Sequence, residues 1–160
     1  MPEVICDTSP IQYLYQTELL GILPELSDKV WIPPAVVEEI SIDHKNNVSL
    51  PDLDSLKWIN VKRPVSEVAL PLIKDLGAGE TEVLMLGLEM PETVLILDDL
   101  LARQLAENLK LKLRGTLGLL LDAKERGIIK SVKPVLDKLE LLRFRLAADT
   151  RNAVLKLAGE

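Results

Sequence analysis

Thr93-Val94-Leu95-Ile96-Leu97-Asp98-Asp99 is the stretch of sequence that points most clearly to a fold. Its first five residues form a short apolar run, with Met90-Pro91 before it and two aspartates after it. A run of this length without a polar face is typical of a strand that is buried on both sides, as the strands of parallel sheets are. We therefore expect a parallel sheet with helices on both of its faces.

Shorter segments of the same kind lie on both sides of this run. Further strands are expected at residues 3–6, 29–32, 58–61 and 112–114, the last of them an edge strand. Helical patterns lie at about residues 11–23, 35–40, 65–76, 80–90, 100–109 and 115–127, and a terminal pair begins at 133 and breaks near 144–145. The polar residues 43–55 are expected to form a loop. This alternation predicts an α/β fold with a mostly parallel central sheet, in a single domain that spans residues 1–160.

The composition supports a globular protein and excludes several kinds of site. Of the 160 residues, 48% are hydrophobic and 28% are charged, which is enough apolar material for one core. Aromatic residues make up only 3%, so a nucleic-acid platform built on aromatic stacking is not expected. The single cysteine, Cys6, and the single histidine, His44, leave no internal disulfide and little material for histidine-based sites. We see no signal peptide and no apolar run of membrane-spanning length, so a cytoplasmic location is expected.

The net charge of −6 is distributed unevenly along the chain. Residues 1–100 contain 6 Lys or Arg against 18 Asp or Glu, whereas residues 101–133 contain 8 against 3. Bulk charge therefore excludes nonspecific coating of polyanions, while the local positive excess allows phosphate contacts. The candidates for such contacts are Arg103, Lys110, Lys112, Arg114, Lys124 and Arg126. The alternative is a solvated surface with ion pairs to the acidic part of the chain.

Carboxylates follow the predicted strands at the edge where open parallel sheets bind ligands. Asp7 follows the first strand and Asp98-Asp99 the buried one, while Glu38-Glu39 and Glu80 lie near two helix starts. Several carboxylates in one place suit a hard cation such as Mg²⁺ or Mn²⁺, which activates water and stabilises the charge of a phosphodiester transition state. Each acid also has a structural alternative, because Asp is a preferred N-cap and a Glu in the first turn is favoured by the helix dipole.

Five segments, in order, resemble the motifs of PIN-domain proteins, and the resemblance covers nearly the whole chain. The segments are Val4-Ile5-Cys6-Asp7-Thr8-Ser9-Pro10, Ile32-Pro33-Pro34-Ala35-Val36-Val37-Glu38-Glu39-Ile40, Gly77-Ala78-Gly79-Glu80-Thr81-Glu82, Leu95-Ile96-Leu97-Asp98-Asp99-Leu100-Leu101-Ala102-Arg103, and Gly115-Thr116-Leu117-Gly118 with the later Ala123-Lys124 and Gly127. Each segment alone is a weak signal, but five in order at suitable spacing are fairly specific. The last segment is similar to the tail of one small prokaryotic subgroup of the family.

The resemblance implies a three-layer α/β/α sandwich and a Mg²⁺- or Mn²⁺-dependent ribonuclease that hydrolyses single-stranded RNA, often as the VapC-like toxin of a toxin–antitoxin pair. The residues that match the family's acidic quartet, as catalytic and metal-binding groups, are Asp7, Glu39, Glu80 and Asp99. Asp98 is a fifth ligand or an alternative to Asp99. Glu39 is preferred over Glu38 because the family's acid directly precedes an aliphatic residue, here Ile40.

Two positions depart from the family's pattern, and the resemblance also implies partners. The third acid is Glu80 where Asp is common, and Leu97 stands where the fourth motif usually has a Thr two residues before its Asp. A cognate antitoxin and a homodimer are expected, with residues 11–23 and 65–76 as hypothetical dimer surfaces. Arg103 lies one helical turn after Asp99. The residues expected to contact RNA phosphates are Arg103, Lys112 and Arg114.

Three other interpretations stay open from the sequence. A catalytically silent relative would keep the fold and act as a protein-binding module. A receiver-like phosphoacceptor would use Asp7 with Asp98-Asp99, but Lys112 is a poor match for the lysine that such a module needs. A phosphatase of the haloacid dehalogenase type would need Asp-x-Asp after the first strand, where this chain has Ser9 in the second place.

Overall fold

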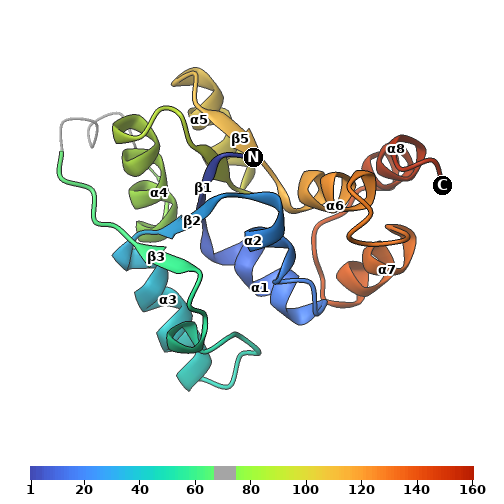
Figure 1. Ribbon diagram of the computed structural model, residues 1–160, viewed down its shortest axis with the longest axis horizontal. Coiled ribbons are helices and arrows are strands. Elements are labelled where there is room, and N and C mark those ends of the chain that lie inside the picture. The colour runs from blue at the N-terminus through green and yellow to red at the C-terminus, as the bar shows by residue number, and fades with distance from the viewer. Residues whose placement is uncertain (67–74) are drawn as a thin grey trace.

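The computed structural model describes residues 1–66 and 75–160, and its centre is a five-stranded sheet in which every strand pair is parallel. The order of the strands across the sheet is β3-β2-β1-β4-β5 (Figure 1). The strands are β1 (Glu3–Cys6), β2 (Lys29–Ile32), β3 (Ile59–Val61), β4 (Val94–Ile96) and β5 (Lys112–Arg114). The predicted parallel sheet is confirmed, and residues 112–114 lie at an edge as expected.

Helices connect the strands and cover both faces of the sheet. They are α1 (Thr8–Gln16), α2 (Ile22–Leu26), α3 (Pro34–Lys45), α4 (Ala78–Glu89), α5 (Leu100–Asn108), α6 (Thr116–Glu125), α7 (Lys133–Leu141) and α8 (Ala148–Leu157). Right-handed crossovers place α1, α2 and α3 on one face and α4 and α5 on the other, because the chain moves first toward β3 and then returns across β1 to β4. α6 packs against α1 and α2, and α8 packs against α6. The result is a three-layer α/β/α sandwich, with α7 and α8 at one end of the molecule (Figure 1).

The core is aliphatic and is centred on β1 and β4. Val4 and Ile5 are fully buried, as are Leu95 and Ile96, and the two strands run side by side with Ile5 opposite Leu95. Each such side chain contributes roughly 1.5–3 kcal/mol through burial. α4 approaches the sheet closely at Gly87, where a Cβ would come within 2.9 Å of Leu95. The apolar run that predicted a buried strand therefore forms the middle of the core.

The stretch 11–23 is two helices rather than one. α1 and α2 are separated at Glu18, whose φ of 62° is left-handed, and the N–H of Leu19 closes the end of α1 by donating to the carbonyl of Leu14 at 2.7 Å. The apolar side chains of this stretch that lie in the core are Ile11, Leu14, Leu20, Ile22 and Leu23. This corrects the expectation that residues 11–23 offer an aliphatic dimer surface, because those side chains are already buried within the chain.

Three further points concern segments outside the sheet. Residues 43–45, expected to be part of a loop, extend α3 to Lys45, and residues 53–55 form a short 3₁₀ turn. The helix and dimer surface expected over residues 65–76 fall largely on residues 67–74, which lie outside the described residues. None of the helices in the described ranges is both long and apolar enough to cross a bilayer.

The carboxyl ends of the strands lie along one side of the sheet, called the carboxyl edge below. The N–H of Asp7 extends the β1–β4 ladder to the carbonyl of Ile96 at 3.1 Å, and the N–H of Leu97 extends the next ladder to Arg114 at 3.0 Å. α1, α3, α5 and α6 begin at this edge because each of them follows a strand. α4 begins there as well, because it runs back toward the start of β4. Five helix N-termini therefore converge on the carboxyl edge.

Candidate active site

Asp7 is the most deeply buried acid at the carboxyl edge. It occupies the N-cap position of α1, but its side chain makes no capping hydrogen bond there, and only 3% of the residue is exposed. Burial raises the pKa of the Asp7 carboxyl from its ordinary 3.8 to about 7, although a backbone hydrogen bond from Thr8 acts in the opposite direction. The negative charges of Glu80, Glu39 and Asp98 raise the pKa further. Asp7 is thus surrounded by acids, and helix capping does not account for it.

Glu39 projects from α3 and is fixed at both of its oxygens. Oε2 accepts from the Thr8 hydroxyl at 2.5 Å, and Oε1 accepts from the backbone N–H of Gly79 at 2.9 Å. A Cβ at position 79 would lie 2.7 Å from Oε2, so only glycine lets the glutamate approach this closely. Glu38, its neighbour, is exposed on the helix surface. The structure therefore places Glu39, rather than Glu38, beside Asp7.

Glu80 lies in the first turn of α4, where the sequence places it near a helix start. Its Oε2 accepts from the N–H of Gly77, the N-cap residue, at 2.9 Å, which satisfies that donor at the beginning of the helix. Partial burial raises the pKa of Glu80, and the charges of Asp99 and Glu39 add to this rise while the hydrogen bond from Gly77 opposes it. Glu80 therefore caps α4 and at the same time faces the other acids.

Asp98 and Asp99 follow β4 and have different partners. Asp99 is the N-cap of α5, and its Oδ2 accepts from the N–H of Ala102 at 2.9 Å. Asp98 accepts from Thr116 at both oxygens, from the backbone N–H at 2.8 Å and from the hydroxyl at 2.6 Å. Burial raises the pKa of Asp98, and the hydrogen bonds from Thr116 and the charge of Arg103 limit the rise. The negative charge of Asp98 raises the pKa of Asp7, and the negative charge of Asp99 raises the pKa of Glu80. Both aspartates therefore lie close to the other acids.

Two residues with a part in this arrangement were not singled out from the sequence. Glu82 of α4 accepts from the N–H of Ala35 in α3 at 2.8 Å, so α3 and α4 each cap the other's N-terminus through Glu82 and Glu39. Thr116 supplies a hydroxyl to the fourth acidic motif, in which position 97 is a fully buried Leu. The position of Glu80 near a helix start is visible in the local sequence, whereas both of these contacts depend on how distant segments pack.

Most of the basic candidates form contacts within the chain. Arg114 donates twice to Asp122, at 3.0 and 2.6 Å, and exposed Lys112 pairs with Glu92 at 3.7 Å. Lys124 pairs with Glu160 at 2.8 Å, and Lys110 is exposed. Arg103 donates through Nη1 to the carbonyl of Leu97 at 2.8 Å, which holds its guanidinium beside the carboxyl edge. Arg103 is therefore the basic candidate with the closest connection to the acids.

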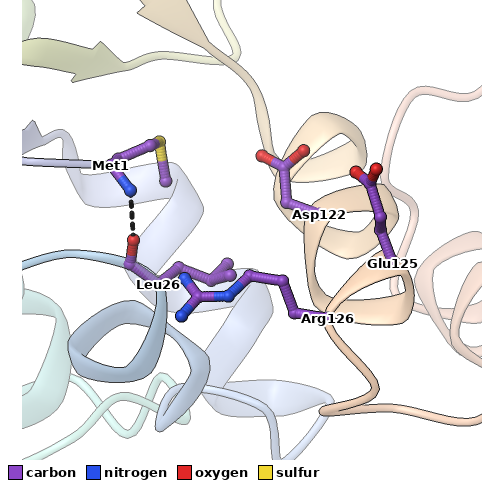
Figure 2. Close-up of a pocket in the computed structure, with 5 residues that line it drawn as sticks. All are labelled: Met1, Leu26, Asp122, Glu125 and Arg126. Atoms are coloured by element: carbon purple, nitrogen blue, oxygen red, sulfur yellow. Dashed lines mark hydrogen bonds between the residues drawn. The ribbon is translucent and has the colours of Figure 1, made fainter.

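Arg126 lies in a different region. Together with Asp122 and Glu125 it lines a small cavity of about 200 Å³ beside Met1 and Leu26 (Figure 2). The N-terminal amine of Met1 donates there to the carbonyl of Leu26 at 2.7 Å. Because Met1 precedes β1, this cavity lies on the amino side of the sheet, whereas the acids lie at the carboxyl edge.

The acids at the carboxyl edge suit a divalent cation by their chemistry and their charge. They are Asp7, Glu39, Glu80, Asp98 and Asp99, all with hard carboxylate oxygens of the kind that Mg²⁺ and Mn²⁺ prefer. Burial is the main cause of the raised pKa of Asp7, and the negative charges of Glu80, Glu39 and Asp98 add to it. Within residues 1–66 and 75–160, however, no three acidic, histidine or cysteine side chains are arranged as a ready metal-holding group. Several of these carboxylates are instead occupied by the hydrogen bonds to helix N-termini described above.

Comparison with known proteins agrees with the fold. A search of curated proteins found no match. A family model described as a PIN domain matches residues 3–160, which is nearly the entire chain. PIN domains have a nuclease-type fold and are generally nucleases that use divalent metal ions. The chain therefore belongs to the PIN-domain family.

Proposed function

We propose that this protein is a metal-dependent endoribonuclease that hydrolyses single-stranded RNA, with its active site at the carboxyl edge and with residues 1–160 acting as one PIN domain. One observation supports this most strongly: Asp7 is 3% exposed, and burial together with three acidic neighbours raises its pKa to about 7. Burying a carboxylate among other carboxylates is unfavourable unless one of them takes up a proton or a cation joins them. Such an arrangement is typical of a functional site rather than of a stabilising one.

The cation would be Mg²⁺ or Mn²⁺, held by Asp7, Glu39 and Glu80 with Asp98 or Asp99. When bound, it supplies an activated water and a counter-charge for the phosphodiester transition state. The chain's own part is to hold the carboxylates in place. Thr8 and Gly79 fix Glu39, and Gly77 fixes Glu80. Without a cation, these same acids repel a phosphate, so substrate binding is expected to depend on the metal.

The positive contribution of the protein to RNA binding comes from two sources. Five helix N-termini meet at the carboxyl edge, and the positive ends of their helix dipoles favour an anion there. Arg103 lies beside these acids and has five N–H donors. One N–H of its Nη1 donates to the carbonyl of Leu97, and within the described part of the chain the other four remain for further partners. We propose Arg103 as the main phosphate contact. Lys112 and Arg114, at the neighbouring edge strand, are proposed as further contacts despite their ion pairs.

The biological setting is also a proposal and follows from family resemblance. We propose a cytoplasmic toxin that is neutralised by a cognate antitoxin protein and acts as a homodimer. The aliphatic residues of 11–23 are core residues, so they are not available as the dimer surface.

A catalytically silent PIN-like module that binds a protein partner is the alternative, and one observation favours it. Glu39, Asp98 and Asp99 already accept hydrogen bonds from within the chain, and in the described residues no three acids form a ready metal-holding group. In this alternative the acids serve as helix caps, and the protein needs no cation.

Chelation followed by re-addition of metal separates the two functions. The purified protein is incubated with a single-stranded RNA and with the same RNA annealed to its complement, in Mg²⁺, in Mn²⁺, and after EDTA. We expect cleavage of the single strand that stops in EDTA and returns when the metal is restored. Cleavage that persists in EDTA would indicate a contaminant or another mechanism, and no cleavage with any metal would favour the silent module.

A further inference from the structure

Thr116 is a buried polar residue whose two hydrogen-bond donors are directed at a single partner. It is the first residue of α6 and is 1% exposed. Its N–H donates to Oδ1 of Asp98 at 2.8 Å, and its hydroxyl donates to Oδ2 at 2.6 Å. Two donors from one residue to the two oxygens of one carboxylate fix both the position and the rotation of that carboxylate. Asp98 is therefore held more tightly than a single helix cap would require.

The contact between Thr116 and Asp98 leaves no space for a side chain at the neighbouring position 115. Gly115 precedes Thr116, and a Cβ at position 115 would lie 2.8 Å from Nη1 of Arg103 and 3.1 Å from Oδ1 of Asp98. Arg103 is in turn held by its hydrogen bond to the carbonyl of Leu97 at 2.8 Å. The end of β4 and the start of α6 thus meet around the Asp98 carboxylate, with a glycine where the contact is closest.

The position of Asp98 in the sheet gives this contact a functional meaning. The N–H of Asp7 donates to the carbonyl of Ile96 at 3.1 Å, so the end of β1 lies beside the end of β4, and Asp98 follows two residues after Ile96. A carboxylate has about four lone-pair sites, and two hydrogen bonds leave others free to meet a cation. Hydrogen bonds that orient a ligand are a common support of metal affinity, and their loss typically weakens binding about 10- to 100-fold.

We propose that Thr116 is a positioning residue for the nuclease site: its hydroxyl holds the Asp98 carboxylate in the orientation in which Asp98, together with Asp7, binds the divalent cation. This inference rests on the proposed function and assigns Asp98, rather than Asp99 alone, to the ion. Asp99 keeps its role as the N-cap of α5.

The test compares variants at Thr116 with a buried threonine elsewhere. Thr116→Val removes the hydroxyl and keeps the shape and the backbone N–H, whereas Thr116→Ser keeps the hydroxyl. Thr93→Val is the matched control, because Thr93 is also buried and its hydroxyl also makes a 2.6 Å hydrogen bond, to Met90 just before β4. Mn²⁺ affinity is measured by calorimetry on the RNA-free protein, and stability is measured by urea unfolding in EDTA.

We expect Thr116→Val to weaken Mn²⁺ binding about 10-fold or more, with Thr116→Ser close to the wild type and Thr93→Val unchanged in affinity. RNA cleavage by Thr116→Val should recover as Mn²⁺ is raised, which a purely structural defect would not do. Unchanged Mn²⁺ affinity in Thr116→Val, beside a wild type that binds Mn²⁺ and cleaves RNA, would overturn this inference and leave the proposed function intact. A wild type that neither binds Mn²⁺ nor cleaves RNA would overturn both.

Discussion

The carboxylate of Glu39 accepts a hydrogen bond from the backbone N–H of Gly79 at 2.9 Å, across 40 residues of sequence. This contact ties α3 to the N-terminus of α4 and brings two acids of the carboxyl edge, Glu39 and Glu80, next to each other. Glu82 makes the reverse contact from α4 to Ala35 in α3. One of the two groups that align these helices, Glu39, therefore also belongs to the acidic cluster.

The first prediction concerns Gly79. In Gly79→Ala the new Cβ would lie 2.7 Å from Oε2 of Glu39, so the glutamate must move away and its hydrogen bond to position 79 is weakened. We expect a loss of about 1–3 kcal/mol in the free energy of unfolding, together with reduced RNA cleavage. Urea unfolding and a cleavage assay measure the two effects.

Gly21→Ala is the control for that substitution. Gly21 has an ordinary φ of −62°, and no atom lies within 4 Å of a Cβ built there. The substitution Gly21→Ala should leave the free energy of unfolding unchanged or raise it by up to about 1 kcal/mol, because alanine reduces the conformational entropy of the unfolded chain. Equal effects of Gly79→Ala and Gly21→Ala would show that the contact with Glu39 has no energetic importance.

The second prediction concerns the pH dependence of the metal-free protein. Because the pKa of Asp7 is about 7 in the folded state against 3.8 ordinarily, the folded chain holds this proton more tightly than the unfolded chain does. The stabilisation from Asp7 is therefore complete below about pH 4 and is lost as the pH rises to 7, by ~4 kcal/mol. Urea unfolding in EDTA between pH 4 and 8 measures this loss.

Asp7→Asn provides the reference for the pH series, because it keeps the shape and cannot ionise. The difference in unfolding free energy between the wild type and this variant should change with pH in the direction stated. Added Mn²⁺ should reduce the change, because the ion compensates the negative charge of Asp7. A difference that is constant from pH 4 to 8 would contradict a raised pKa at Asp7.

The third prediction concerns Arg103. Replacing Arg103 by Ala removes a guanidinium beside Asp98 and its hydrogen bond to Leu97. If Arg103 contacts a phosphate, RNA binding should weaken and the slope of log affinity against log salt concentration should become shallower by about one unit. Lys138→Ala, an exposed cation on α7, should leave the slope unchanged. An unchanged slope in Arg103→Ala would mean that Arg103 does not contact a phosphate and only stabilises the turn after β4.

The sheet and the location of the acids follow from the sequence because both are local properties. The apolar run of β4 is bounded by Pro91 and Asp98, and parallel strands place their carboxyl ends, and therefore Asp7 and Asp98, at one edge. The break after α1 was not predicted, because the left-handed residue at the end of the helix is Glu18, a residue type that does not mark a turn, although Gly21 follows just before α2.

The contacts that hold the acids in place are the part that the sequence did not reveal. Thr116 and Asp98 are 18 residues apart, and Glu82 and Ala35 are 47 apart. Each pair meets because of the way in which whole helices pack against the sheet. A local sequence pattern does not contain this information. The sequence therefore predicts which acids gather, while the structure is needed to show which groups orient them.

The most direct test of the central claim is the rate of single-stranded RNA cleavage in Mg²⁺ by the wild type, Asp7→Asn and Glu107→Gln. Both variants remove one negative charge, but Glu107 is exposed on α5 and lies outside the acidic cluster. The account predicts that Asp7→Asn loses cleavage by 100-fold or more, an order-of-magnitude expectation for a lost metal ligand, while Glu107→Gln cleaves like the wild type. Equal cleavage by Asp7→Asn and the wild type would contradict the assignment of the carboxyl edge as the active site.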